Sequence, residues 1–135
     1  MTTLHAYNLP LDGCYLGPIR FKATSHTAAV DHIKTLIQMP ELRQEHAIVH
    51  CEEHGDTEII FWLDNVYDSG DDSNSNESAR KLAAALATKS TALTAPLYGN
   101  CVVTAIDPDS RTVASLPAHT MEKIVSIAIG RCTQA

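Results

Sequence analysis

Alternating apolar and polar positions in the first half of the chain predict three β-strands. The alternation is strict from Ile19 to Ala23, as expected for a half-buried strand, and Gly17-Pro18 marks its start. Two later runs, Ala47–Val49 and Ile59–Leu63, are short, apolar and rich in β-branched or aromatic residues. Because residues 53–56 between them are polar and include the turn residues Gly and Asp, these runs are predicted to form a hairpin.

A second hairpin is predicted in the last third of the chain. Cys101–Ile106 is an apolar run interrupted only by a threonine, and residues 112–114 form a shorter strand. The segment Asp107-Pro108-Asp109-Ser110 between them contains the residues that favour a tight turn. This part of the sequence therefore predicts a compact strand–turn–strand unit.

Helical spacing predicts a first helix at about residues 27–39. Its apolar positions are Val30, Ile33 and Ile37. Ser25 and Thr27 are candidate N-caps at its start, and Pro40 ends the pattern.

Two further helices follow the same spacing. Asn74 with Glu77 resembles a capping box before the second, whose apolar stripe is Ala79, Leu82, Ala83 and Leu86. Pro117 is predicted to open the third helix, and Gly130 is predicted to cap its C-terminus. The apolar stripe of the third helix is Met121, Ile124, Val125 and Ala128.

Two hairpins and an N-terminal strand, interleaved with three amphipathic helices, predict an α+β fold. We expect a two-layer sandwich, with a mainly antiparallel sheet of about five strands and the helices on one face. The passage from residue 19 to residue 51 leaves a parallel pair of strands open, because a strand–helix–strand connection allows it.

The composition is that of one globular domain covering residues 1–135. The chain has 135 residues, of which 44% are hydrophobic and 19% are charged, enough for one continuous core. No stretch approaches the roughly 20 apolar residues that span a bilayer, and residues 1–7 lack the parts of a signal peptide. A cytoplasmic protein without membrane insertion is predicted.

The acidic residues are unevenly distributed. Nine of the sixteen lie between Glu52 and Glu77, a stretch without Lys or Arg, whereas the remaining residues carry a small positive balance. Residues 64–76 are rich in Asp, Ser, Asn and Gly and predict a flexible surface loop. The net charge of −6 and the scattered basic residues argue against nucleic acid as a partner.

This acidic segment has three interpretations. The first is a solvated loop. The second is a divalent-ion site, although placing Gly70 at the sixth position of an EF-hand loop puts Tyr67 at a ligand position. The third is a recognition surface for a basic protein partner. For that surface the predicted contact residues are Asp64, Asp68, Asp71, Asp72 and Glu77.

The segment His50-Cys51-Glu52-Glu53-His54 matches the H-x-x-E-H pattern of inverzincin metalloproteases. That chemistry needs a helix, because only a helix places the two histidines on one face to bind zinc beside the glutamate. The flanks here are strand-like. A hairpin end is therefore one hypothesis, and a transition-metal site formed by His50, Cys51 and His54, with His46 or His5 joining, is another.

The remaining motifs carry little catalytic signal. Four cysteines are widely spaced, and free buried thiols are favoured over disulfides. Cys101 lies within a predicted strand, where core packing explains it better than nucleophilic catalysis. The glycine-rich nucleotide-binding loops and the G-x-S-x-G elbow are missing from the sequence, and no cofactor is predicted.

Leu97–Val103, followed by a polar turn and by Ser115-Leu116 at a helix start, resembles a small domain family of unknown function found in phage and plasmid chains. The resemblance covers part of the C-terminal third, and this chain differs in its longer acidic loop before the second helix. It implies an accessory protein of a virus or mobile element, with no catalytic residues to transfer.

The sequence thus favours a small accessory or regulatory module that binds another macromolecule, rather than an enzyme. One alternative is a metal-dependent hydrolase centred on His50, Glu53 and His54. Another is a self-associating subunit, or homo-oligomer, that pairs through an exposed edge at Ile59–Leu63 or at the first strand.

Overall fold

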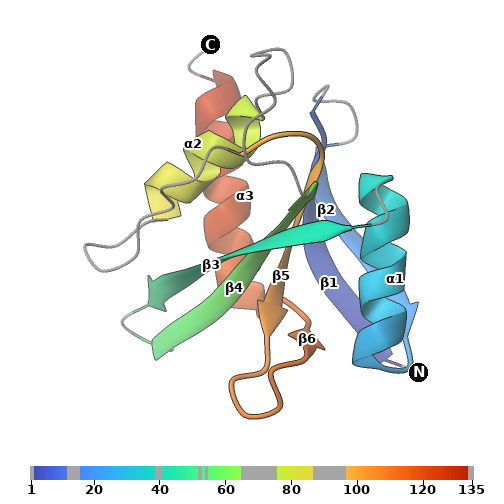
Figure 1. Cartoon of the computed structure of the whole chain (residues 1–135). Helices are drawn as coiled ribbons and strands as arrows, with labels where there is room; N and C mark the ends of the chain where they lie inside the picture. Colours follow the sequence, from blue (N-terminus) through green and yellow to red (C-terminus); the bar gives the residue numbers. More distant parts are fainter. Residues whose placement is uncertain are drawn as a thin grey trace.

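The computed structural model describes residues 2–11, 16–38, 41–51, 53, 55–64, 76–86 and 97–133. Within them the chain forms six strands and three helices (Figure 1). In chain order they are β1 (Thr2–Leu9), β2 (Gly17–Ala23), α1 (His26–Ile37), β3 (Leu42–Cys51), β4 (Gly55–Asp64), α2 (Glu77–Leu86), β5 (Cys101–Ile106), β6 (Val113–Ala114) and α3 (Ala118–Thr133).

The described strands form one antiparallel sheet in the order β2-β1-β5-β4-β3, with β6 paired to β5. The predicted α+β sandwich is confirmed, as are both hairpins. The option of a parallel pair between residues 19 and 51 is not used, since β2 and β3 lie at opposite edges of the sheet. None of the described helices has the length and apolar character needed to cross a bilayer.

The strand β1 was not predicted. Its side chains alternate only in part, because Ala6 and Tyr7 are adjacent and both are buried. The strand lies between β2 and β5, where each face receives apolar neighbours. A strand in that position loses the clean period of two on which sequence prediction depends.

The helices occupy both faces of the sheet instead of the single face expected. α1 packs on one face through Ala29, Ile33 and Ile37, which contact a core that includes Trp62 of β4. α2 and α3 pack on the other face (Figure 1). There the helix side chains in the core are Ala79, Leu82, Ala83 and Ile124. Both faces of the central strands are consequently removed from water.

α1 agrees with its prediction to within two residues at either end. Ser25 is the N-cap, and its Oγ accepts the N–H of Ala28 at 3.1 Å. The helix ends at Gln38, which has a left-handed backbone with φ 67° and donates its N–H to the carbonyl of Lys34. The predicted terminator, Pro40, lies outside the described residues.

The predicted ends of the other two helices need correction. α2 begins directly after Asn76, which takes the N-cap position that the sequence assigned to Asn74; Asn74 lies outside the described residues. α3 continues through Gly130 to Thr133, so that glycine is not a C-cap. A glycine within a helix costs less than the hydrogen bonds that a continuing helix retains.

Asn76 connects three parts of the fold. Its Oδ1 accepts the N–H of Ala79 at 2.9 Å, which caps α2, and its Nδ2 donates to the carbonyls of Leu9 at 2.9 Å and Gly99 at 2.7 Å. Its own N–H donates to the carbonyl of Leu97 at 2.8 Å. With 1% of its surface exposed, this side chain ties α2 to the end of β1 and to the approach to β5.

The proposed self-association edge at Ile59–Leu63 is wrong. This segment belongs to β4, an interior strand paired with both β3 and β5. Ile59, Phe61 and Leu63 have no exposed surface and lie in the core beneath α2 and α3. Among the described strands, the edges are β3 and β2, and β2 contains the other predicted contact, the strand from Ile19 to Ala23.

Replacing Asn76 with alanine should lower the free energy of unfolding by about 2–4 kcal/mol, because it removes the cap and leaves one buried and one partly buried carbonyl without their donor. Urea denaturation followed by circular dichroism measures the change. Ser25→Ala is the matched control: it removes a cap alone and should cost about 1 kcal/mol. Equal losses in the two variants would contradict the connecting role of Asn76.

Candidate functional site

The sheet opens between β4 and β5 at one end. Their ladder ends at the pair formed by Ile59 and Ala105. At Ala105 and Ile106, β5 pairs with β6 on its other side, and the chain after β6 is held against β1, where the His5 N–H donates to Ser115 Oγ at 2.8 Å. The end of β5 is therefore drawn toward β1, and β4 and β5 diverge (Figure 1).

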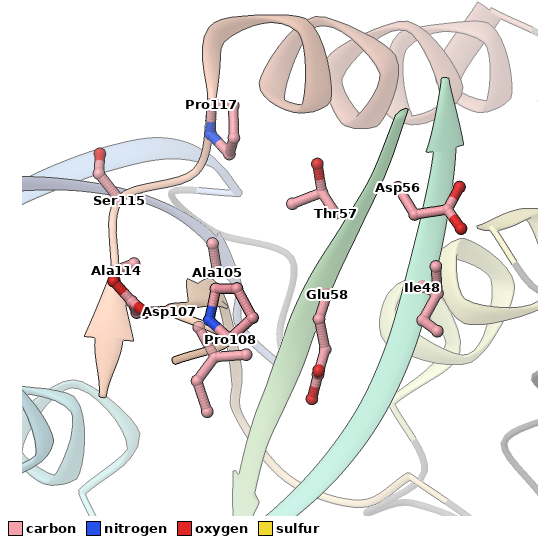
Figure 2. A pocket seen from close by; sticks show the side chains of 11 residues that line it. Ile48, Asp56, Thr57, Glu58, Ala105, Asp107, Pro108, Ala114, Ser115 and Pro117 are labelled. Carbon is pink, nitrogen blue, oxygen red and sulfur yellow. The ribbon is translucent and has the colours of Figure 1, made fainter. Parts of the chain in front are cut away.

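A pocket of about 460 Å³ lies in this gap. Figure 2 shows residues of β4 on one side, Ala114 and Ser115 on the other, and Pro117 where the chain enters α3. Thr57 and Glu58 are neighbours that point to opposite faces of the sheet, yet both line the pocket, so it passes between strands. The lining residues are Ile48, Asp56, Thr57, Glu58, Ala105, Ile106, Asp107, Pro108, Ala114, Ser115 and Pro117.

The pocket combines apolar surface with carboxylates. Ile48 is 37% exposed and is one of two exposed large hydrophobic residues in the described part of the chain. The acidic members are Asp56, Glu58 and Asp107, and none of the described lining residues is basic. This composition suits a ligand that has both an apolar part and a positive charge.

The hairpin register brings the polar side chains of one wall together. Ile48 pairs with Glu58, and His50 pairs with Asp56, so these residues share one face of the β3–β4 hairpin. His46 lies two residues before Ile48 and projects on the same face. Two histidines of β3 thus lie beside two carboxylates of β4.

Glu58 is held by two partners. Arg111 donates from Nη1 to Oε1 at 2.8 Å and from Nη2 to Oε2 at 2.9 Å, a bidentate ion pair. His46 Nδ1 lies 2.9 Å from Oε2. The hydrogen bonds from Arg111 hold the pKa of Glu58 below its ordinary value of 4.5; burial opposes this effect and His46 adds to it. Glu58 is therefore ionised at neutral pH.

The turn between β5 and β6 positions Arg111. Asp107 Oδ1 accepts the N–H groups of Asp109 at 2.8 Å and Ser110 at 3.1 Å, and these bonds, that of Ser110 foremost, lower the pKa of Asp107. Arg111 donates its N–H to the Asp107 carbonyl at 2.8 Å. Its φ of 59° is left-handed, a conformation more common for glycine in such hairpin turns.

α3 holds the tip of the β3–β4 hairpin in place. Thr120 Oγ1 donates to Thr57 Oγ1 at 3.3 Å, and Lys123 Nζ donates to the His50 carbonyl at 3.2 Å. His50 Nδ1 also lies 2.6 Å from Asp56 Oδ1. These contacts fix one wall of the pocket against the helix that follows the other wall.

The acidic residues predicted to contact a partner do not lie together in the described part of the structure. Asp64 ends β4, six residues or about 20 Å of extended chain from Glu58. Glu77 is the first residue of α2 and forms an ion pair with Arg80 at 2.6 Å. Of the loop predicted at 64–76, residues 65–75 lie outside the described residues, and Asp68, Asp71 and Asp72 are among them. The acidic stretch therefore has described members at both ends of β4.

The H-x-x-E-H segment is a hairpin end in its described part. His50 and Cys51 are the last residues of β3, Glu53 is in the turn, and β4 starts at Gly55. The helical spacing that zinc proteases require is not present at these positions.

Glu52, His54 and the Cys51 side chain are not described. No group of three or more His, Cys, Asp or Glu side chains placed to hold a metal occurs within the described ranges, and a metal site at His50, Cys51 and His54 remains a prediction.

Cys101 is a core residue. It is fully buried on β5, and burial raises the pKa of its thiol far above the ordinary value. A thiol of this kind stays protonated and is a poor nucleophile. The structure thus gives Cys101 the packing role that its place in the sequence suggested.

Sequence reasoning missed Glu58, Asp107 and Arg111. A signal for Glu58 was present: a turn centred on Glu53 pairs residues whose numbers add up to 106, which sets Ile48 opposite Glu58 and His50 opposite Asp56. Nothing comparable existed for Arg111, because its contact with Glu58 spans 53 residues and depends on how two hairpins lie in space.

Comparisons of the chain with protein-family models, with curated proteins and with solved structures find no match.

Replacing Glu58 with glutamine should destabilise the protein at neutral pH, because an amide cannot form the ion pair with Arg111. Since the pKa of Glu58 is lowered on folding, its stabilising contribution is present above pH 4.5 and is lost as the pH falls through the folded-state pKa. The difference in free energy of unfolding between wild type and Glu58→Gln should therefore shrink below pH 4.5, as measured by urea denaturation.

Glu122→Gln, at an exposed position of α3, changes the net charge equally and serves as the control for this experiment. A difference between wild type and Glu58→Gln that stays constant down to about pH 3 would show that the ionised form of Glu58 is not stabilised by folding.

Proposed function

We propose that the protein is a small accessory or regulatory module that binds another protein, and that its contact is the pocket between β4 and β5. The observation that carries this proposal is a pocket with apolar lining whose charged lining residues are all carboxylates. The partner would present a basic segment that also contains apolar residues. A cytoplasmic location and an origin in a virus or mobile element, both predicted from the sequence, belong to the same proposal.

The pocket is favoured over the Asp64–Glu77 segment because stable binding needs apolar contact as well as charge. Ile48 supplies exposed apolar surface at the pocket. At the other end of β4, the described apolar residues Leu63 and Leu97 are buried in the core. Acidic residues there would act mainly on the rate of association.

The net negative charge of the chain supports a basic partner. The net charge is −6, and a negative field accelerates the approach of a positively charged segment. Part of the local charge is already neutralised, because Arg111 pairs with Glu58. The negative charge at the pocket thus depends mainly on Asp56 and Asp107.

Peptides selected from a random phage-displayed library against the purified protein should be rich in Lys or Arg beside apolar residues. Asp56→Asn or Asp107→Asn should each weaken a selected synthetic peptide about two- to fivefold, by loss of one rim charge, as measured by calorimetry at low salt. Asparagine keeps an oxygen acceptor, so the bonds made by Asp107 Oδ1 are retained.

Asp31→Asn is the matched control, because it removes one exposed charge from α1 and should leave the affinity unchanged. A triple Asp68→Asn, Asp71→Asn, Asp72→Asn variant tests the predicted loop. Loss of binding in the triple variant alone would move the contact to that loop. Selection of neutral or acidic peptides would overturn the proposal.

A further inference from the structure

Arg111 joins the two walls of the pocket. It belongs to the turn that follows the lining residues Asp107 and Pro108, whereas Glu58 lies on β4 across the gap. Two hydrogen bonds, at 2.8 and 2.9 Å, connect them. The guanidinium of the chain itself is thus bound to a carboxylate of the pocket.

The position is an unusual one for arginine. Its left-handed backbone, with φ 59°, would suit glycine better and carries a conformational cost for a residue with a Cβ. The side chain offsets this cost only through contacts that glycine could not make, and the contact with Glu58 is the main one described.

The ion pair is open to exchange. The Arg111 side chain is 52% exposed and that of Glu58 is 26% exposed, so water and salt weaken their attraction. A guanidinium from another chain could make the same bidentate bonds. The more exposed partner, Arg111, can swing into solvent, while Glu58 stays on its strand.

We propose that Arg111 occupies the binding position at Glu58 on the edge of this pocket, and that an arginine side chain of the partner protein displaces it to bind Glu58. The proposal rests on the proposed function and names the group that is recognised. Apolar lining residues such as Ile48, Ile106 and Pro108 would contact the methylene groups of the incoming side chain. Asp56 and Asp107 would attract its charge.

The test uses Nα-benzoyl-arginine amide, with the uncharged Nα-benzoyl-citrulline amide as the matched compound. Binding to the whole 135-residue chain is followed by two-dimensional amide NMR at low salt. Arg111→Gly removes the competitor and keeps a residue suited to the left-handed turn, so it should tighten binding of the arginine compound about tenfold. When Glu58→Gln is already present, adding Arg111→Gly should not increase the affinity for the arginine compound.

Lys22→Gln is the control variant, because it removes one exposed positive charge from β2 and leaves the pocket unchanged. A gain in Lys22→Gln as large as that in Arg111→Gly would indicate general electrostatics and overturn the proposal. Equal binding of the citrulline compound would overturn guanidinium recognition. Thermal unfolding of each variant, followed by circular dichroism, shows whether it is folded.

The experiments distinguish the exchange of arginine side chains at Glu58 from the proposed binding of a protein partner. If neither wild type nor Arg111→Gly binds the arginine compound, the exchange at Glu58 is wrong. Basic peptides whose affinity depends on Asp56 and Asp107 would still support a protein-binding module. The reverse result is that the arginine compound binds but no basic peptide is selected. It would support the exchange at Glu58 and overturn the proposal of a basic protein partner.

Discussion

The structure depends on the burial of β5 on both faces. Every side chain from Cys101 to Ile106 is buried, so neither face of the central strand can be left to water. α1 covers one face, and α2 with α3 covers the other. The helices must be held in place for this cover to work, and the buried Asn76 side chain holds α2 to the ends of β1 and of the segment that leads into β5.

The pocket is a consequence of how β5 ends. A central strand has two neighbours, and β5 exchanges one of them along its length. On one side it pairs with β1 from Cys101 to Val103 and with β6 at Ala105 and Ile106, and on the other side its pairing with β4 stops at Ala105. Once the turn sends the chain back toward β1, β4 continues without a partner on that side among the described residues. The gap between β4 and β5 is lined by the carboxylates of Glu58 and Asp107, so apolar contact does not close it. The ion pair between Arg111 and Glu58 bridges part of the gap instead.

Most of the fold follows from local pattern, and the site does not. Hairpins and helices were predicted because their signals lie within about ten residues, as with Ser25 before α1 or Gly55 at the start of β4. The run Cys101–Ile106 lacks the alternation of a half-exposed strand, yet helices were expected on one face only, because cover on both faces depends on the strand order. The contact between Arg111 and Glu58 joins two hairpins, and no local period encodes such a contact.

A cluster of like charges in sequence is also a poor guide to a charged surface. Along a strand, residues six apart are about 20 Å apart, so β4 sends Glu58 and Asp64 to different ends of the sheet. Glu58 and Asp56 do stay close together on β4, but each carboxylate has partners of its own. Arg111 and His46 bind Glu58, and His50 binds Asp56. In the proposed function, the acidic stretch therefore acts through the few carboxylates that the register places beside apolar surface, and that function rests on the hairpin pairing more than on net charge.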